Sequence, residues 1–251
     1  MFGVLILNLE PETRDSSSMY LGHYAVAFAA KRASPNTSLG TLIAASQLID
    51  ILWPLLVLAG LEKVAVAPGR TVVTPLNFTK YPYTHSLFSV LVLAFLFAAF
   101  YWASSRNRTG AVVVWLAVVS HWLLDLLSHA PDLPLFPGSD RTVGLGLWNS
   151  LWGTLVVELG LFLLGLILYL SVTRPANRVG TYSLAALVLF LLTTYAMNIL
   201  GPPPPDYRSV AYAAMLLWLL VPWGYWIDRN RHVTVGPGAR AAKLKFRGRR
   251  L

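Results

Sequence analysis

The sequence predicts an all-α fold, a polytopic transmembrane bundle of about six helices. Two observations of composition indicate this: 56% of the 251 residues are hydrophobic, and only 12% are charged. An average soluble domain has roughly 25% charged residues. The third observation is that the apolar residues fall into runs of about 20, the length that a helix needs to cross a membrane. Lipid accepts the apolar outer surface that such a chain must present.

Six apolar runs each fit a spanning helix: 39–61, 86–104, 111–130, 150–171, 181–200 and 209–227. The segments between them, such as 131–146 and 201–205, are rich in proline, glycine and other turn-forming residues. A shorter apolar stretch over 20–30 cannot span, and it predicts a re-entrant or amphipathic N-terminal helix. We therefore expect one integral membrane domain over residues 1–228, followed by a basic tail over residues 229–251.

Lysine and arginine residues predict which loops face the cytoplasm, because cytoplasmic loops hold the excess of these residues. Eight of the twenty lie after residue 228. With that tail inside, six alternating spans also place these loop residues inside: Lys31, Arg32, Arg106, Arg108, Arg174 and Arg178. The opposite side then receives only Lys63, Arg70, Lys80, Arg141 and Arg208. Both termini are expected in the cytoplasm, where the tail would meet anionic lipid headgroups rather than nucleic acid.

Ionisable side chains within the apolar segments are the candidate functional residues, because a charge in hydrocarbon is costly unless it is paired, hydrated or bound to an ion. Seven residues meet this description: His23, Asp50, His85, His121, Asp125, His129 and Glu158. A helix rises about 1.5 Å per residue. Counting from the span ends puts Asp50, His121 and Glu158 at a similar depth, with Asp125, His129 and His85 nearer the outer side. His23 joins them if its short helix enters from the cytoplasmic side. These residues therefore predict one cavity that opens outward.

The third span has the most specific local pattern, in which His121, Asp125 and His129 recur every four residues. At 3.6 residues per turn, these positions share a stripe about 80° wide on one helix face. Neutral imidazole and carboxylate are ligands of zinc, manganese and iron. The chain has no cysteine, so thiolate ligands are excluded. We expect a divalent metal ion, with zinc as the first choice and manganese as the alternative.

Two other interpretations of these buried groups remain open at this stage. In a transporter or channel, buried acids and histidines form a proton relay or a cation path. In a non-catalytic membrane scaffold, the same groups only form hydrogen bonds between helices. The sequence has no internal repeat of the kind common in transporters, and the candidate residues all lie in the N-terminal two thirds of the chain.

The motifs resemble those of bacterial membrane-bound metal-dependent hydrolases, a family that includes a LexA-regulated inner-membrane protein. The resemblance covers residues 20–170, and its most specific parts are Thr84-His85-Ser86 and the pair His121-x-x-x-Asp125. The order of the histidines and acids is also remotely similar to that in zinc-dependent phospholipases C and single-strand-specific nucleases. The chain departs from those relatives at Thr154, where they have the histidine of a second His-x-x-x-acid pair.

This resemblance implies a metal-dependent hydrolase of a bacterial inner membrane. One or two divalent ions would be held by Asp50, His85, His121 and Asp125, with His23 or His129 completing the set. Glu158 would act as a ligand or as the general base, so that Glu158 and Asp125 are the expected catalytic residues. The inferred depth of the site favours a lipidic substrate, such as a phospholipid or a polyprenyl phosphate, whose phosphoester bond is attacked by a metal-activated water.

Overall fold

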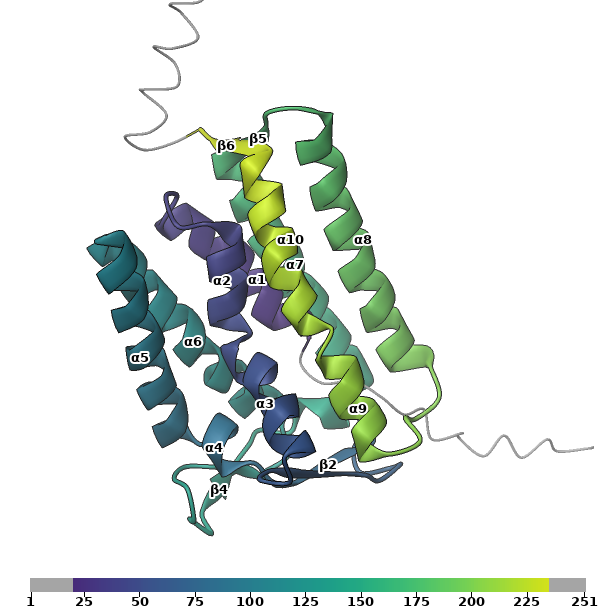
Figure 1. Ribbon diagram of the computed structural model, residues 1–251. Helices are drawn as coiled ribbons and strands as arrows, with labels where there is room; N and C mark the ends of the chain where they lie inside the picture. Colours follow the sequence, from purple (N-terminus) through teal and green to yellow (C-terminus); the bar gives the residue numbers. More distant parts are fainter. Residues whose placement is uncertain (1–19, 235–251) are drawn as a thin grey trace, which may run out of the picture.

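Long apolar helices form most of the bundle in the computed structural model, which describes residues 20–234 (Figure 1). Four are unbroken: α5 (Leu87–Ser105), α6 (Arg108–Ser128), α7 (Leu151–Val172) and α8 (Arg178–Leu200). A fifth runs through α9 (Tyr207–Ala214) and α10 (Leu217–Arg229). Five helices are thus long and apolar enough to cross a membrane, or six if one bent pair also counts as a span. The predicted fold class is confirmed.

The bent pair lies where the sequence predicts the first span. It consists of α2 (Leu39–Ser46) and α3 (Leu48–Leu58), whose axes meet at 54° around Gln47. In a continuous helix, the Ser46 carbonyl would accept the N–H group of Asp50. At this break it accepts a hydrogen bond from His121 on α6 instead. Irregular backbone of this kind is tolerated at membrane depth where it is buried in protein or lines a cavity.

The short helix α1 (Leu21–Ala33) packs inside the bundle and not on its surface (Figure 1). Leu21, Tyr24 and Phe28 are almost completely buried. Its closest neighbour is α7, where a Cβ atom on Gly165 would collide with the carbonyl oxygen of Ala25 and lie 2.8 Å from its Cα atom. Of the two sequence-based alternatives for this segment, the buried position fits a re-entrant helix rather than an interfacial one.

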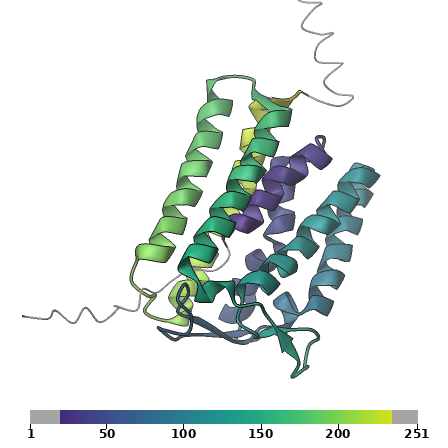
Figure 2. The same ribbon diagram turned by 180° about the vertical axis from the view of Figure 1, so that it is seen from behind.

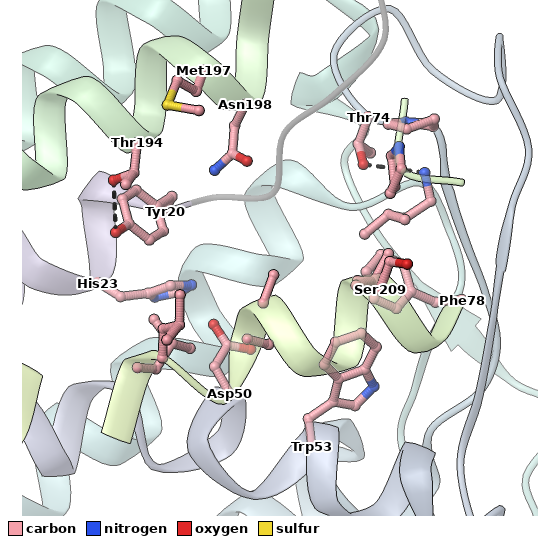
Figure 3. Close-up of a pocket in the computed structure, with 18 of the residues that line it drawn as sticks. Tyr20, His23, Asp50, Trp53, Thr74, Phe78, Thr194, Met197, Asn198 and Ser209 are labelled. Carbon is pink, nitrogen blue, oxygen red and sulfur yellow. Dashed lines mark hydrogen bonds between the residues drawn. The ribbon is translucent and has the colours of Figure 1, made fainter. Parts of the chain in front are cut away.

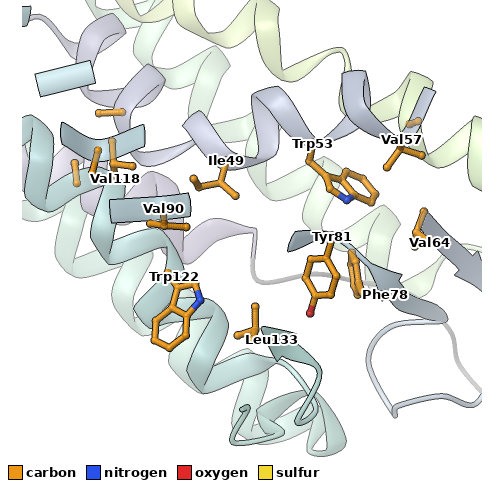
Figure 4. Close-up of a cluster of buried hydrophobic side chains, with 14 of the residues drawn as sticks. Ile49, Trp53, Val57, Val64, Phe78, Tyr81, Val90, Val118, Trp122 and Leu133 are labelled. Atoms are coloured by element: carbon orange, nitrogen blue, oxygen red, sulfur yellow. The ribbon is translucent and has the colours of Figure 1, made fainter. Parts of the chain in front are cut away.

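One end of the bundle is covered by short elements that lie over the site described below (Figures 1 and 2). They are β1 (Lys63–Val66), β2 (Leu76–Lys80), α4 (Pro82–His85), β3 (Leu133–Pro134), β4 (Thr142–Val143) and η1 (Leu147–Asn149). Strands β1 and β2 form an antiparallel hairpin, and β3 pairs with β4. A core of buried side chains, including Trp53, Phe78 and Trp122, fixes this cover to α3, α5 and α6 (Figure 4).

The other end of the bundle carries β5 (Thr173–Pro175) paired with β6 (Arg231–Val233). The first residues of the predicted basic tail therefore complete α10 and form β6, whereas residues 235–251 lie outside the described chain. Lys31 at this end donates to Asp228, with 2.7 Å between Nζ and Oδ2, and Asp228 also accepts the N–H of Leu39. The loops that the charge count groups together thus lie at one end of the bundle (Figure 1).

Candidate metal centre

Six of the seven candidate residues meet in one cluster, although they come from four segments of the chain. Helix α6 contributes His121 and Asp125 one turn apart, and its C-cap residue is His129. The other three members come from α1, α3 and the end of α4: His23, Asp50 and His85. All five histidine and aspartate side chains other than Asp50 are at most 4% exposed, and 28% of the Asp50 side chain is exposed.

The ligand atoms form two groups that share His121. One group is His23, His121 and Asp125, and the other is Asp50, His85 and His121; within each group the atoms lie within 4.8 Å of one another. The His121 Nε2 atom is 3.3 Å from Asp125 Oδ2 and 3.5 Å from Asp50 Oδ1. Two carboxylates that approach the same imidazole repel each other unless positive charge lies between them. Positive charge at this point, from a protonated His121 or from a bound cation, would offset that repulsion.

Asp125 lies between the two groups, and its two oxygens face different histidines. Its Oδ2 atom is 3.9 Å from His85 Nε2 as well as 3.3 Å from His121 Nε2. Its Oδ1 atom is 3.3 Å from His23 Nε2 and 4.0 Å from His129 Nε2. A carboxylate in this position can bind one metal ion or bridge two.

The Nδ1 atom of His121 is fixed by the backbone at the break between α2 and α3. It lies 2.7 Å from the Ser46 carbonyl oxygen, which can only accept a hydrogen bond. His121 Nδ1 therefore carries a proton, so that in the neutral ring the Nε2 lone pair is free and directed at the two aspartates. A metal-binding histidine commonly donates its other ring N–H to the protein in this way.

His85 is oriented by a short relay through Thr84 and Glu62. The Thr84 hydroxyl donates to Glu62 Oε2 at 2.7 Å, so it must accept from His85 Nδ1, which is also 2.7 Å away. The other Glu62 oxygen accepts the backbone N–H groups of Tyr83 and Thr84. In the neutral ring, this leaves the Nε2 lone pair of His85 free, 3.6 Å from Asp50 Oδ1.

His129 is held in the same way by Asp132 and Tyr81. Its Nδ1 atom is 3.0 Å from Asp132 Oδ1, which also accepts the Tyr81 hydroxyl at 2.7 Å. Burial, together with the Asp132 carboxylate, raises the pKa of Tyr81, so the phenol stays protonated and donates. Asp132, which the sequence suggests only as a reserve ligand, thus orients His129 from behind. Three histidines in the cluster thus direct Nδ1 at the protein; the Nε2 atoms of His85 and His121 belong to the groups of candidate ligands, whereas that of His129 approaches only Asp125, at 4.0 Å.

The separations within the cluster are longer than hydrogen bonds but match the spacing of metal ligands. Hydrogen bonds between nitrogen and oxygen usually measure about 2.7–3.2 Å. Two ligand atoms around a tetrahedral zinc ion, each about 2.0–2.1 Å from it, lie roughly 3.3 Å apart. His121 Nε2 and Asp125 Oδ2 are buried and have no hydrogen-bond partner among the described residues. The residues present therefore fit a divalent cation.

Glu158 lies close to the cluster but belongs to neither group of candidate ligands. Both of its oxygens face the N-terminus of α1, where Oε1 accepts the N–H of Tyr20 and Oε2 accepts the N–H of Gly22, each at 3.0 Å. A carboxylate at this position satisfies backbone donors that have no partner within the helix. The contact fixes the first residues of α1, up to Gly22, which directly precedes His23.

A cavity of about 380 Å³ gives access to the cluster. His23 and Asp50 lie at one end of it, as Figure 3 shows, with Asp125, His85 and His129 also reaching its wall. The remaining wall comes mainly from α8, α9 and the hairpin. A substrate or water in this cavity would reach Asp50 first, because that side chain is the most exposed of the six.

Four residues that support the cluster had no clear signal in the sequence. Ser46 contributes only a carbonyl group, and Glu62 lies in a turn 22 residues from Thr84 along the chain. Thr84 precedes His85 in the Thr-His-Ser motif, which was the one available hint of its role. Tyr81 could be linked to His129 only after the fold placed α4 beside the end of α6.

The fold and the cluster together define a helical protein with five to six candidate membrane spans and a buried histidine and aspartate site that could hold a metal ion. Comparisons of the chain with protein-family models, with curated proteins and with solved structures give no match.

Proposed function

We propose that the protein is an integral membrane hydrolase that uses one or two divalent metal ions, zinc in the first place, to cleave a phosphoester bond in a lipidic substrate. The proposal depends above all on one observation. The Nδ1 atoms of His85 and His121 face protein acceptors, and their Nε2 atoms lie 3.3–3.9 Å from the carboxylate oxygens of Asp50 and Asp125. A set of hydrogen bonds between helices would not require free lone pairs at the centre.

A bound metal ion would polarise the phosphoryl oxygen and lower the pKa of a coordinated water toward about 7. Hydrolysis then joins the water oxygen to phosphorus and breaks the ester bond, and the leaving oxygen takes up a proton. Asp50 borders the cavity and is the more exposed carboxylate of the two, so we assign it the transfer of the water proton. Asp125 is assigned to hold the ions, and Glu158 to fix α1 and His23.

Metal analysis and hydrolysis of a phosphoester panel by the purified protein test this proposal. We expect stoichiometric zinc or manganese, lost when His121 and Asp125 are changed to Ala, and hydrolysis that stops when the metal is chelated and returns when it is restored. The matched control is His232→Ala, because His232 is exposed in β6 at the far end of the bundle. A metal-free protein, or a metal-loaded protein inactive on the whole panel, would contradict the proposal.

The same variants separate this function from the two alternatives. A transporter with a proton relay would conduct protons in liposomes without bound metal. A scaffold would bind no metal and would lose stability in the double variant. The central Nε2 and Oδ2 atoms without hydrogen bonds favour the metal-dependent function over both.

A further inference from the structure

The cavity beside the cluster has two chemically different ends. Its inner end is formed by the imidazole and carboxylate groups of the site, including His23 and Asp125, which are almost completely buried. Its other walls are mostly apolar and include Phe190 on α8 and Leu217 and Leu220 on α10. Among the described residues that line it, the only charged side chains are those of the cluster.

The apolar end of the cavity is lined by exposed residues of α8, of α9 and of the loop between them, which includes Pro202. Met197 on α8 lines the cavity and is 66% exposed. Ala213 on α9 also lines it and is exposed. In Figure 3, Met197 and Thr194 lie on one wall, with His23 and Asp50 below them. Because α8 and α9 belong to candidate spans, an opening between them would face lipid.

From this shape we infer that the substrate is a single-chain amphiphile, whose phosphoester head reaches the cluster and whose hydrocarbon chain leaves sideways between α8 and α9 into the membrane. The inference rests on the proposed function and adds the form of the substrate and its path. A volume of about 380 Å³ is near the lower end of the range for small-molecule sites, roughly 300–1,000 Å³. It accommodates a head and the first part of one chain, whereas two chains would need a wider mouth.

Two chromogenic phosphodiesters that release the same product test the inference: p-nitrophenyl methyl phosphate and p-nitrophenyl dodecyl phosphate. The metal-loaded protein should have the higher kcat/KM for the dodecyl compound. Ala213→Trp narrows the mouth and should lower that kcat/KM at least about tenfold, since the chain loses buried methylene groups. The preference for the dodecyl over the methyl compound, expressed as the ratio of the two kcat/KM values, should fall by a similar factor.

Ala196→Trp is the matched control, because Ala196 is also exposed on α8 but does not line the cavity. It should change neither rate. Equal kcat/KM values for the two compounds, or an Ala213→Trp variant as active as the wild type on the dodecyl compound, would overturn the inference while leaving the hydrolase intact. Inhibition by phosphatidic acid, which has two chains, as strong as inhibition by dodecyl phosphate would overturn the single-chain assignment.

A binding measurement keeps the inference testable if neither compound is hydrolysed. Dodecyl phosphate with a diazirine at the chain end should crosslink to α8 and α9 in the wild type and at least about tenfold less in Ala213→Trp. That result with no hydrolysis would refute the proposed function and retain the chain path. Crosslinks spread over the exposed apolar face of α5, which does not line the cavity, would refute the path.

Discussion

Thr84 connects a metal-binding candidate to a buried acid through a single hydroxyl group. Thr84→Val preserves the shape of the side chain but removes both of its hydrogen bonds, which leaves His85 Nδ1 and Glu62 Oε2 without this partner. We expect zinc affinity to fall about 10–100-fold, as for other residues that orient metal ligands from behind. Competition with a chelator measures the change.

The conservative variant Thr84→Ser retains the hydroxyl and should restore most of the zinc affinity. If Thr84→Val bound zinc as tightly as the wild type, His85 would not be a ligand oriented by this relay. A loss of affinity in both variants would point to packing of the threonine methyl group instead.

A substitution that changes one group of Glu158 distinguishes a structural role of this residue from a catalytic one. In Glu158→Gln, the new amide group faces one of the two N–H donors at the start of α1 and cannot accept it. We expect a loss of about 1–2 kcal/mol in the free energy of unfolding, with the metal content unchanged. A melting curve in detergent and metal analysis of the same sample measure both.

The opposite result for Glu158→Gln would assign this residue to metal binding. If Glu158→Gln lost its metal but kept its melting temperature, Glu158 would be a ligand, as the resemblance to the hydrolase family implies. Its carboxylate would then have to turn away from Tyr20 and Gly22 when the metal binds.

At the residue scale, the sequence predicted those features of the site that depend on the spacing of neighbouring residues. The spacing of His121 and Asp125 places both on one face of any helix, whatever surrounds it. Depth and ligand type then suggested Asp50, His85 and His23 as companions. The sequence did not reveal the groups that fix each imidazole, since a backbone carbonyl such as that of Ser46 has no side-chain signature. Glu158 was ambiguous because a buried acid serves a helix end and a metal equally well.

At the element scale, the contact between α1 and α7 depends on one glycine. A Cβ atom at Gly165 would lie 2.8 Å from the Ala25 Cα atom, whereas one at Gly160 on the same helix would have no neighbour within 4 Å. Gly165→Val should therefore push α1 away from α7 and cost about 1–3 kcal/mol in stability. Gly160→Val is the matched control and should not lower the melting temperature.

Displacement of α1 should also reach the metal site, because His23 and the Glu158 contact both depend on the position of this helix. We expect Gly165→Val to weaken metal binding in the protein that remains folded, whereas Gly160→Val should bind normally. Equal melting temperatures for the two variants would contradict the close packing of α1 on α7.

The bend between α2 and α3 shows why some elements could not be predicted. Residues 39–61 are apolar enough to form one span, and the residue at which the helix breaks, Gln47, is neither a glycine nor a proline. The break is stabilised by a tertiary contact, since the Ser46 carbonyl accepts the N–H of His121. Because His121 lies 75 residues from Ser46 along the chain, their contact produces no local pattern in the hydropathy of the sequence.

At the scale of the whole molecule, the fold was predictable because the membrane restricts the backbone structures that a spanning segment can form. In lipid, the backbone of a spanning segment must satisfy its own hydrogen bonds, so long apolar runs become helices. The six predicted runs accordingly coincide with the five long helices and the bent pair. The direction in which the bundle crosses the membrane does not follow from the fold, and it stays a prediction from the charge count.

Single cysteines can test that direction without background, because the chain has no cysteine of its own. Asp140 is exposed in the loops over the metal site, and Ala176 is exposed between α7 and α8 at the opposite end. The excess of basic loops at the Ala176 end predicts that it is cytoplasmic. In bacterial spheroplasts, a membrane-impermeant maleimide should therefore label Asp140→Cys at once and Ala176→Cys only after the membrane is opened. The reverse pattern would place the metal site at the cytoplasmic face, so its substrates would come from the inner leaflet.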